Sequence, residues 1–538
     1  MKTYSQKEVV DACIVGGAIG GVMARILAEG GLSVVVLDAG PRWNPARDFV
    51  NDPWEMEKKM ERRMPFLYAG DATGRGELTV FAVGGRMNHW GASTPRYRPA
   101  VFLSKTMQGF GNDWPLTYDD LLPAYQKAER EFGVSGDHTR YPFPRDPFPL
   151  PGHPMPYADQ VVKKGFDALG LRTFLGPHGI LSQTYAGRPA CNYCGFCHYG
   201  CPTNSKANPL ITHIPQAISA GAELRTGCYV KEVTVDQSRR ASGVVYVDPD
   251  GKEQQQKARM VIVASGPPLS RLLLLSKSKL FPDGLANNNG QVGKNVISKG
   301  GTASVWGIYE QRLEGYRGFA TLNSYDFIEN DEKRGFVGGF AVGTQATGFR
   351  RPDQLIEYAS PGWGPEFKTF AKDFYSHCVG LNTGESSAGP ANEKNSVDLH
   401  PEAKDEWDLP LARVAMYRTE SDRAMRKFSI KIMTDIHRAA GAKKIFVEGE
   451  GGGPVPIDRS TEDRQPSYLG GDCRMGKDPK TSVVNSYSQS HEVKNLFLLG
   501  VSTMVSGGHG PVTLTLVALA NRAGEYILKN KRDIFKTA

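Results

Sequence analysis

The sequence predicts an α/β protein in which a Rossmann-like domain is interleaved with a second domain built on an antiparallel sheet. A strand, a glycine-rich turn, a helix and a second strand follow one another in residues 9–38. Two further apolar strands end in glycine shortly before a helix, at 261–266 and 495–500. Between them, residues 300–345 show the period-two alternation of an antiparallel sheet. A chain of 538 residues is long enough for two such domains.

The first unit predicts a dinucleotide site, for FAD or NAD. In a strand, turn and helix unit of this kind, backbone N–H groups at the helix start bind a pyrophosphate, and an acidic residue ending the second strand binds a ribose hydroxyl. Asp38 lies 22 residues after Gly16, which fits the usual interval of about 20. Ala18 stands in place of the middle glycine of the motif, and its methyl group crowds the closest approach to a phosphate.

A second glycine-rich segment covers residues 83–92. Paired glycines beside aromatic residues suit a backbone that passes close to a flat ring system. A tight turn with a packed tryptophan gives the same sequence, and the residues alone do not separate the two interpretations. The candidate cofactor contacts in this segment are Gly84, Gly85, Asn88, His89 and Trp90.

Four cysteines stand close together, and Pro202 follows the last of them directly: Cys191, Cys194, Cys197 and Cys201. Their spacing is that of bacterial ferredoxins, in which the fourth cysteine ordinarily serves a second cluster. With only one such run, the fourth cysteine either completes a [4Fe-4S] cluster or stands outside a [3Fe-4S] cluster. The alternatives are a structural zinc site and two disulfides. Zinc usually takes two well-separated CxxC pairs, so the spacing favours an iron-sulfur cluster and a role in single-electron transfer.

The rest of the chain divides between the two domains. Residues 101–190 hold many prolines and aromatic residues and predict loops and short helices over a core. Residues 222–263 alternate as strands do and lead to a short helix at 270–276. We predict a nucleotide-binding domain in three parts, 1–100, 206–298 and 465–538, the last with the active-site loops, a cap region with the cysteines at 101–205, and a substrate domain at 299–464.

The C-terminal segment predicts a second contact with the cofactor. Its strand ends at Gly500, and the loop that follows contains His509 between glycines and then Pro511. A glycine-ended strand that runs into a helix, here predicted at 513–529, suggests that Gly500 and Pro511 approach the cofactor. His509 can reach from its loop toward a substrate, although the loop sequence fits a surface histidine equally well.

The composition excludes several classes of protein. Hydrophobic residues make up 40% of the chain and charged residues 23%, and no apolar run approaches the roughly 18 residues that span a bilayer. The first nine residues are mostly polar or charged, so we expect no secretory signal. The net charge of +8 comes without Lys or Arg blocks, which argues against nucleic acid and fits a weakly acidic electron-transfer partner. The remaining cysteines are scattered, as in a reducing compartment, so we expect cytoplasmic folding.

Together these segments resemble the glucose-methanol-choline (GMC) oxidoreductases, a family of FAD enzymes, over nearly the whole chain. The similarity is greatest to the branch with a cysteine cluster, the flavin subunits of fructose dehydrogenase and gluconate dehydrogenase and glucoside 3-dehydrogenase. The HW pair is also similar to that of pyranose oxidase. The matching segments are the N-terminal turn, GGxxxHW at 84–90, and residues 261–276, 293–295, 392–399, 473–476, 495–500 and 514–520.

The resemblance implies an FAD whose adenine half is held by Gly16, Gly21 and Asp38. It implies that His89 is attached covalently to the flavin ring, as the corresponding histidine is in pyranose oxidase and fructose dehydrogenase. Relatives in this branch oxidise a sugar hydroxyl and pass electrons through an iron-sulfur cluster, where they have one, to a cytochrome or other acceptor. Some are exported with a small partner subunit, so a periplasmic location stays open beside the cytoplasmic one.

The chain departs from the family at the catalytic pair. The family has a histidine before its GxxRMG-type segment and an asparagine or second histidine before the LT of the last helix. Here the first position is Tyr468 and the second is Pro511, or Gly510 if Val512 is inserted. A tyrosine with a pKa near 10 is a poor base at neutral pH unless its neighbours lower that pKa. Three explanations stay open: His509 is the base and Tyr468 orients the substrate, Tyr468 is itself the acid or base, or the chain has lost oxidation.

These explanations correspond to three functions. The first is an FAD-dependent dehydrogenase that oxidises a hydroxyl of a sugar, glycoside, polyol or cyclic alcohol, with electrons leaving through the cluster to an acceptor other than oxygen. The second is a flavoenzyme that desaturates or isomerises next to a carbonyl. The third is an electron-transfer subunit without catalysis. We predict the first, with an electron-acceptor protein such as a cytochrome as partner, because a cluster is superfluous when oxygen takes electrons directly from flavin.

Overall fold

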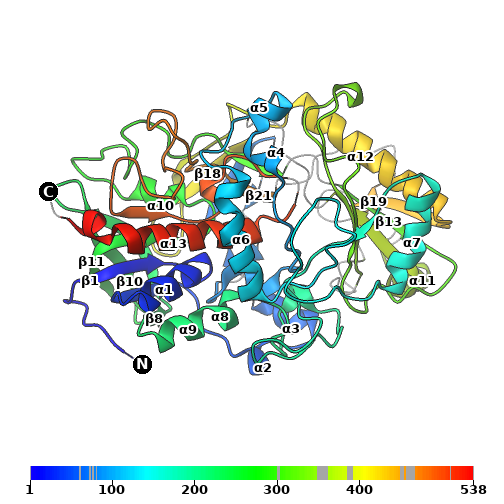
Figure 1. The fold of residues 1–538 in the computed structure, drawn as a ribbon, viewed down its shortest axis with the longest axis horizontal. Coiled ribbons are helices and arrows are strands. Elements are labelled where there is room, and N and C mark those ends of the chain that lie inside the picture. Colours follow the sequence, from blue (N-terminus) through cyan, green and yellow to red (C-terminus); the bar gives the residue numbers. More distant parts are fainter. Residues whose placement is uncertain are drawn as a thin grey trace.

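The computed structural model describes residues 2–59, 62–71, 74–75, 78–79, 81–299, 303–347, 355, 362–383, 392–448, 454–455, 467–508 and 510–536. At 62–63, 74–75, 78–79, 298–299, 448, 454–455 and 467–468 only the backbone is described. Two large sheets lie toward opposite ends of the molecule's long axis (Figure 1). One is mainly parallel and the other antiparallel, which confirms the predicted α/β fold class.

The first sheet is the predicted Rossmann-like sheet. Its parallel strands run in the order β8 (Glu223–Thr226), β2 (Val34–Asp38), β1 (Val10–Val15), β11 (Glu253–Val263) and β22 (Leu496–Leu498). β1 and β2 are almost continuous runs of buried apolar residues, as expected of strands covered on both faces. The first half of β11 pairs instead with the antiparallel strand β10 (Ala241–Val247), and β10 pairs in turn with β9 (Tyr229–Val235). Segments far apart in the sequence thus share one sheet, as interleaving requires.

Two long helices lie side by side against this sheet, α1 (Ile19–Glu29) and α13 (Thr513–Phe535) (Figure 1). Gly524 of α13 allows their close approach, because a Cβ atom there would lie 2.9 Å from the Ile26 side chain of α1. α6 (Tyr118–Phe132) packs against α13 and starts with a capping box between Thr117 and Asp120. The apolar core of the parallel domain lies between these helices and the sheet.

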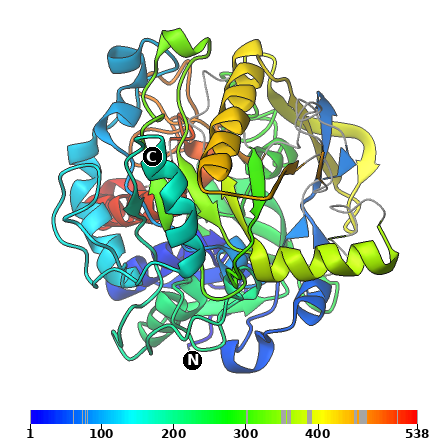
Figure 2. The same ribbon diagram turned by 90° about the vertical axis from the view of Figure 1, so that its right-hand side faces the viewer.

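The second sheet is antiparallel, in the order β20 (Pro454–Val455), β19 (Lys444–Glu448), β13 (Ser304–Ile308), β16 (Cys378–Asn382), β15 (Val342–Gln345), β14 (Leu322–Ser324) and β7 (Phe174–Leu175). Neighbouring residues of β13 face opposite ways. Val305 packs with α7 (Tyr157–Ala168) and α12 (Glu420–Ala439), whereas Trp306 packs with α11 (Gly364–His377). Figure 2, which faces this end of the molecule, shows the three helices around the sheet.

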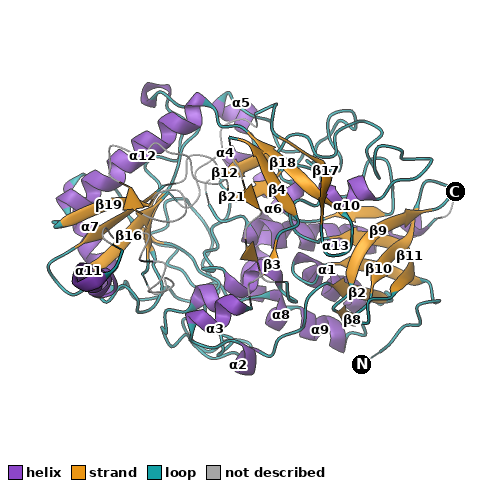
Figure 3. Ribbon diagram, turned by 180° about the vertical axis from the view of Figure 1, so that it is seen from behind, coloured by secondary structure: helices purple, strands orange, loops and turns teal. Residues whose placement is uncertain are grey.

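Smaller elements connect the two ends. A four-stranded sheet, β17 (Ser396–Lys404), β18 (Pro410–Met416), β4 (Phe66–Gly70) and β5 (Gly74–Arg75), lies between the large sheets when the molecule is seen from behind (Figure 3). Two-stranded pairs join β12 (Ile297–Lys299) to β21 (Ser467–Gly470) and β3 (Arg62–Arg63) to β6 (Leu78–Thr79). The short helices are α2 (Pro45–Asp48), α3 (Pro53–Lys58), α4 (Pro99–Phe102), α5 (Ser104–Gln108), α8 (Pro209–Thr212), α9 (Ile214–Ser219) and α10 (Ser270–Leu275).

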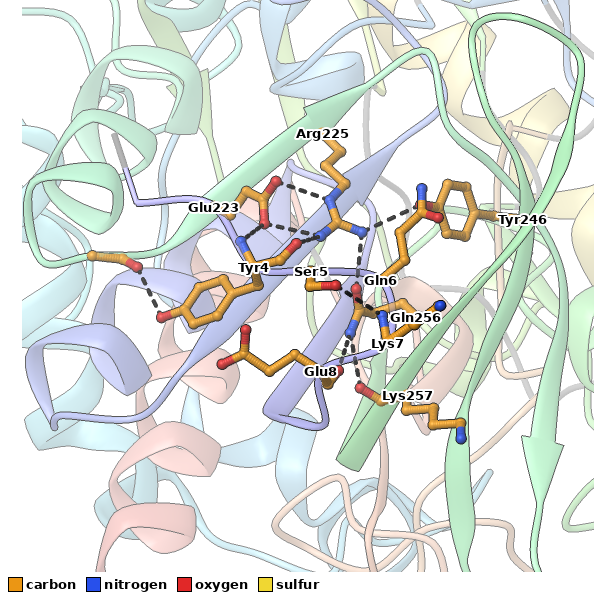
Figure 4. Close-up of polar contacts among 11 residues, drawn as sticks. Tyr4, Ser5, Gln6, Lys7, Glu8, Glu223, Arg225, Tyr246, Gln256 and Lys257 are labelled. Atoms are coloured by element: carbon orange, nitrogen blue, oxygen red, sulfur yellow. Dashed lines mark hydrogen bonds and ion pairs between the residues drawn. The ribbon is translucent and has the colours of Figure 1, made fainter.

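A polar cluster anchors the N-terminal segment to the parallel sheet (Figure 4). The backbone N–H of Tyr4 donates to Glu223 Oε2 at 2.8 Å, and Arg225 Nη2 donates to the Tyr4 carbonyl at 2.7 Å. Arg225 Nη1 also donates to Gln256 Oε1 at 2.9 Å, and Gln256 Nε2 donates to the Glu8 carbonyl at 2.9 Å. Because these side chains belong to β8 and β11, the cluster fixes how the chain enters β1 and the glycine turn at its far end.

Candidate active site

A cavity of about 760 Å³ begins at the carboxyl ends of the parallel strands and extends to the antiparallel sheet. Its lining includes the last residues of β1 and β2 and the residues just after β11 and β22. Ligands of open α/β sheets bind at this edge of the sheet. Residues of β14, β15 and β16 line the cavity as well, so the cavity joins the two domains.

The glycine turn after β1 lies in this cavity and has the conformation that its sequence predicts. Gly16 has φ +97°, and a Cβ atom there would lie 2.5 Å from the Ala264 carbonyl oxygen. The backbone N–H of Gly17 donates to Asp38 Oδ2 at 2.7 Å, and the N–H of Gly40 donates to Oδ1 at 2.9 Å. Burial raises the pKa of Asp38, and these two donors partly offset that rise. Asp38 is therefore fixed in the cavity wall at the end of β2.

The N-terminus of α1 opens toward the same space. The helix begins without a side-chain cap and without an acidic residue in its first turn, and Ala18 and Ile19 line the cavity. Its first N–H groups are suited to an anion such as a pyrophosphate. Gly21, predicted to hold the cofactor, is buried within the first turn of α1, where an added Cβ atom would lie 3.0 Å from the Ile214 side chain of α9. This position gives Gly21 a role in helix packing.

The second glycine segment forms the 3-10 helix η1 (Gly85–His89), with Gly84 before it at φ +95°. Asn88 is buried, donates from Nδ2 to the Val83 carbonyl at 3.1 Å and accepts at Oδ1 from Asn208 Nδ2. An added Cβ atom at Gly84 would lie 2.6 Å from Asn208 Oδ1. Gly84 and Asn88 thus form the support of the turn. The predicted contacts that line the cavity are Gly85, His89 and Trp90.

His89 presents a reactive nitrogen in this wall. Its Nε2 atom is buried and has no hydrogen-bond partner among the described residues. Burial, together with the nearby positive charges of Arg86, Lys206 and His198, lowers the pKa of His89 to about 3. The imidazole is therefore neutral at physiological pH, with an unprotonated nitrogen that can act as a nucleophile.

The cysteine loop adjoins η1 and contributes Gly195, Cys197 and His198 to the cavity wall. Two backbone N–H groups point at its sulfur atoms, from Tyr193 to Cys191 Sγ at 3.3 Å and from Lys206 to Cys201 Sγ at 3.4 Å. The other cysteines raise the pKa of both Cys191 and Cys197 by their negative charge, but burial contributes more, and the pKa values reach about 11 and about 12.

The structure bears differently on the two predictions for this loop, a pair of disulfides and a metal site. All eight cysteines, those of the loop included, are free thiols, which contradicts the disulfide alternative in this structure. Within the described ranges, no group of three or more His, Cys, Asp or Glu side chains is arranged to hold a metal ion. The four sulfur atoms therefore do not form a closed ligand set in this structure, although they have the donor chemistry and the spacing of one.

The two predicted catalytic side chains fall outside the described residues. His509 is not described, and Tyr468 is described only as backbone, in β21. Their surroundings are described. Gly510 and Pro511 line the cavity, as does Gly500. The chain just before His509 is held by a hydrogen bond, in which Tyr97 Oη donates to the Gly507 carbonyl at 2.6 Å.

Sequence reasoning missed the polar end of the cavity. Asn323 of β14, Gln345 of β15 and Asn382 of β16 line it, together with Thr344, Thr383 and Tyr325. Asn382 Nδ2 donates to Gln345 Oε1 at 3.3 Å, which leaves other amide atoms of this pair for a ligand. His178 also lines this end, and burial lowers its pKa to about 3. The arrangement suits a ligand with several hydroxyl groups.

The residues present fit FAD. An uncapped helix N-terminus and a carboxylate at the end of β2 match the pyrophosphate and ribose, and an unpartnered buried imidazole nitrogen lies further along the same cavity. Bound FAD would supply a hydride acceptor, which protein side chains cannot provide.

The sequence matches the GMC oxidoreductase family at two places, its N-terminal model at residues 107–299 and its C-terminal model at 391–520. The chain is 33% identical, over 98% of its length, to 2-methyl-1,2-propanediol dehydrogenase from Mycolicibacterium austroafricanum, and covers 96% of that protein. It is 26% identical to the fructose dehydrogenase large subunit from Gluconobacter japonicus, covering 97% of this chain and 98% of that one.

Solved structures agree on the fold. A formate oxidase variant from Aspergillus oryzae RIB40 superposes with a TM-score of 0.70 at 15% identity, over 99% of this chain and 100% of that one. Pyridoxine 4-oxidase from Mesorbium loti superposes with a TM-score of 0.66 at 16% identity, over 96% and 98%.

The fold and the cavity define a dinucleotide-dependent oxidoreductase. The chain belongs to the GMC oxidoreductase family, which confirms the predicted family and FAD as its cofactor. In the part of the chain that the structure describes, none of the helices combines the length and the apolar character needed to cross a membrane.

Proposed function

We propose that the protein is an FAD-dependent dehydrogenase that oxidises a hydroxyl group of a polyol, sugar or cyclic alcohol and passes the electrons to an acceptor other than oxygen. One observation carries the proposal. One cavity is lined by the nucleotide turn, by polar residues of the antiparallel sheet at its far end, and by Cys197 of the cysteine loop. These are the sites that the cofactor, the substrate and the departing electrons require.

The polar end of the cavity supports a substrate with neighbouring hydroxyl groups. Amide side chains donate and accept at the same time, as a hydroxyl does, and Gln345 and Asn382 lie next to each other there. The substrates in the names of similar proteins, 2-methyl-1,2-propanediol, fructose and gluconate, all carry oxygen on adjacent carbons. We assign Asn382 and Gln345 to the recognition of a hydroxyl beside the one that reacts.

We assign removal of the substrate hydroxyl proton to the loop that precedes α13. His509 takes the hydroxyl proton as general base, and Tyr468 orients the substrate. His509 is adjacent in sequence to Gly510, which lines the cavity, and β21, which contains Tyr468, ends next to the Gly471 to Cys473 turn. Replacing each in turn tests the assignment. His509→Ala is expected to abolish flavin reduction by substrate, whereas Tyr468→Phe is expected to raise KM more than it lowers kcat.

The cysteine loop is the proposed exit for electrons, through an iron-sulfur cluster held by Cys191, Cys194, Cys197 and Cys201. The ferredoxin-type spacing supports it, and so do the two backbone N–H groups directed at sulfur, which favour thiolate ligands. Since no group of side chains in the described ranges is arranged to hold a metal ion, the loop must rearrange to bind the cluster. The acceptor would be a cytochrome or similar protein, in the cytoplasm or, with co-export by a small subunit, in the periplasm.

Anaerobic mixing with a panel of substrates tests the function. Vicinal diols and sugars are expected to bleach the flavin absorption, with ferricyanide but not oxygen restoring it rapidly. Bleaching by cyclic ketones and not by any polyol would support desaturation next to a carbonyl instead. Rapid reoxidation by oxygen would make the protein an oxidase, as the similar paromamine 6'-oxidase from Streptomyces fradiae is by its name. Absence of bleaching by all compounds would favour an electron-transfer subunit.

Asn382→Leu is expected to weaken substrate binding while FAD binding stays intact. Loss of one hydrogen bond to a substrate hydroxyl costs about 1.4 kcal/mol, so KM should rise about tenfold with little change in kcat. Steady-state kinetics with the best substrate of the panel measures the change. Asn288→Leu, at an exposed position outside the cavity lining, is the matched control. Equal KM values for Asn382→Leu and the parent protein would remove Asn382 from the substrate site.

His89 is the proposed covalent attachment point of the flavin. Its neutral, unpartnered Nε2 atom has the chemistry of the attacking group. We expect acid-denatured parent protein to retain its yellow colour, and His89→Asn to release all flavin into the supernatant. His198→Asn, at a histidine of the cysteine loop that also lines the cavity, should keep the flavin attached. Free flavin from the denatured parent protein would contradict the attachment.

A further inference from the structure

Lys206 is a buried lysine whose side chain has no role in the function proposed above. Its side chain is almost completely enclosed, at 2% exposure. Nζ donates to three main-chain carbonyls, those of Asn88 at 3.1 Å, Trp90 at 3.0 Å and Cys197. Three acceptors around one nitrogen require three N–H donors, which only the charged ammonium form provides. The geometry therefore places a positive charge behind the cavity wall.

The three carbonyls belong to two separate segments. Asn88 and Trp90 flank His89 in the cavity-facing turn, and Cys197 belongs to the cysteine loop. The residues after Lys206 hold the same turn, because the Ala207 carbonyl accepts from Trp90 Nε1 at 3.0 Å and Asn208 donates to Asn88. Residues 206–208 thus form a strap, and Lys206 is the only member that also reaches the cysteine loop in the described structure.

The charge of Lys206 is not balanced by a carboxylate. Its three donors are occupied by neutral carbonyls, and no Asp or Glu in the described ranges forms an ion pair with it. Burial lowers the pKa of Lys206, although the negative charge of Cys197, Cys201 and Cys194 opposes that shift. A buried cation is costly, and negative charge placed near it offsets the cost. The cavity on the other side of His89 and Trp90 is where reduced flavin, which is anionic near neutral pH, would lie.

We propose that Lys206 is a positioning residue that locks the cavity-facing turn 88–90 to the cysteine loop and whose buried charge favours the reduced, anionic flavin. The inference rests on the proposed function, since it takes the cavity to hold FAD. Removing the charge should make the flavin harder to reduce. Removing the hydrogen bonds of Nζ should loosen the wall between the flavin and the cysteine loop.

The test is the flavin midpoint potential, measured by anaerobic spectroelectrochemistry on the full-length holoprotein. Lys206→Met, and Lys206→Gln, which keeps hydrogen-bond donors without the charge, are both expected to lower the ratio of reduced to oxidised flavin at least tenfold at a fixed potential. For a two-electron couple this is a shift of about 30 mV. Lys206→Arg should restore the parent potential. Lys127→Met, which removes a lysine on α6 paired with Glu525, is the control and should leave the potential unchanged.

Parent-like potentials in the Met or the Gln variant would overturn the proposal, because a purely structural lysine leaves the potential where it was. Should Lys206→Met fail to fold, the comparison of the Gln and Arg variants decides in the same way. The result differs from a failure of the proposed function. A parent protein that binds no FAD overturns both, whereas a flavin that polyols reduce, with a potential that Lys206 does not affect, overturns only this inference.

Discussion

Gly16→Ala is expected to yield a folded protein that does not retain FAD. Gly16 has φ +97°, and its missing side chain lets the turn pass the end of β11, where a methyl group would lie 2.5 Å from the Ala264 carbonyl oxygen. The turn must move, and the N–H of Gly17 that fixes Asp38 moves with it. Strain of this kind costs about 3 kcal/mol, so FAD affinity should fall about 100-fold.

Titration of flavin-free protein with FAD, followed by flavin fluorescence, measures this change when both variants also carry His89→Asn, so that FAD binds reversibly. Gly31→Ala is a matched control, because Gly31 also has a positive φ, +82°, but an added Cβ atom there meets no atom within 4 Å. That variant should lose about 1 kcal/mol of stability and bind FAD normally. If Gly16→Ala binds FAD as tightly as Gly31→Ala does, the assignment of the turn as the pyrophosphate site is wrong.

Cys197→Ser is expected to separate substrate oxidation from electron exit. Cys197 lines the cavity and belongs to the proposed ligand set, so its loss should break the path between the flavin and the acceptor. Substrate should still bleach the flavin at the parent rate. Turnover with a one-electron acceptor protein should fall at least 100-fold, which corresponds to a rise of about 3 kcal/mol in activation free energy.

Stopped-flow and steady-state measurements on one preparation give both rates. The control is Asn192→Ala, an exposed residue of the same loop that has no thiol. Should Cys197→Ser keep full turnover with the acceptor, the electrons leave the flavin by another route. A slower flavin bleaching in Cys197→Ser would instead show that the thiol supports the cavity wall itself.

The sequence was most informative where an element depends only on residues that are close together in the chain. The strand, turn and helix unit at 9–38 was predicted from its glycines and from Asp38, and the structure contains it as β1, α1 and β2. The last helix is regular up to its predicted end at 529, because Asn530 has non-helical backbone angles (φ −109°, ψ 15°), and a short helical segment continues beyond this kink to Phe535. The period-two segments near 300–345 became β13, β14 and β15, because alternation is a property of each strand alone.

The sequence was least informative where a residue's role depends on a distant partner. Gly84 and Asn88 were predicted to contact the cofactor, and the structure adds that both contact Asn208, which lies 120 residues from Asn88 in the chain. Asn382 and Gln345 reach the cavity only because β15 and β16 pair in one register, which no local pattern specifies. Lys206 offers one local sign, a lysine shortly after the fourth cysteine, but its burial could not be foreseen from that.

The proposed function requires that a flavin and an iron-sulfur cluster share this chain and exchange electrons. The most direct measurement is the paramagnetic resonance spectrum of anaerobically purified protein, before and after reduction by a polyol substrate, with iron and acid-labile sulfide determined on the same sample. We predict iron and sulfide in the protein and a new signal from a one-electron-reduced or otherwise redox-changed cluster as the flavin bleaches. Zinc without iron or sulfide, or a flavin that is reduced with no metal-centred change, would contradict the account.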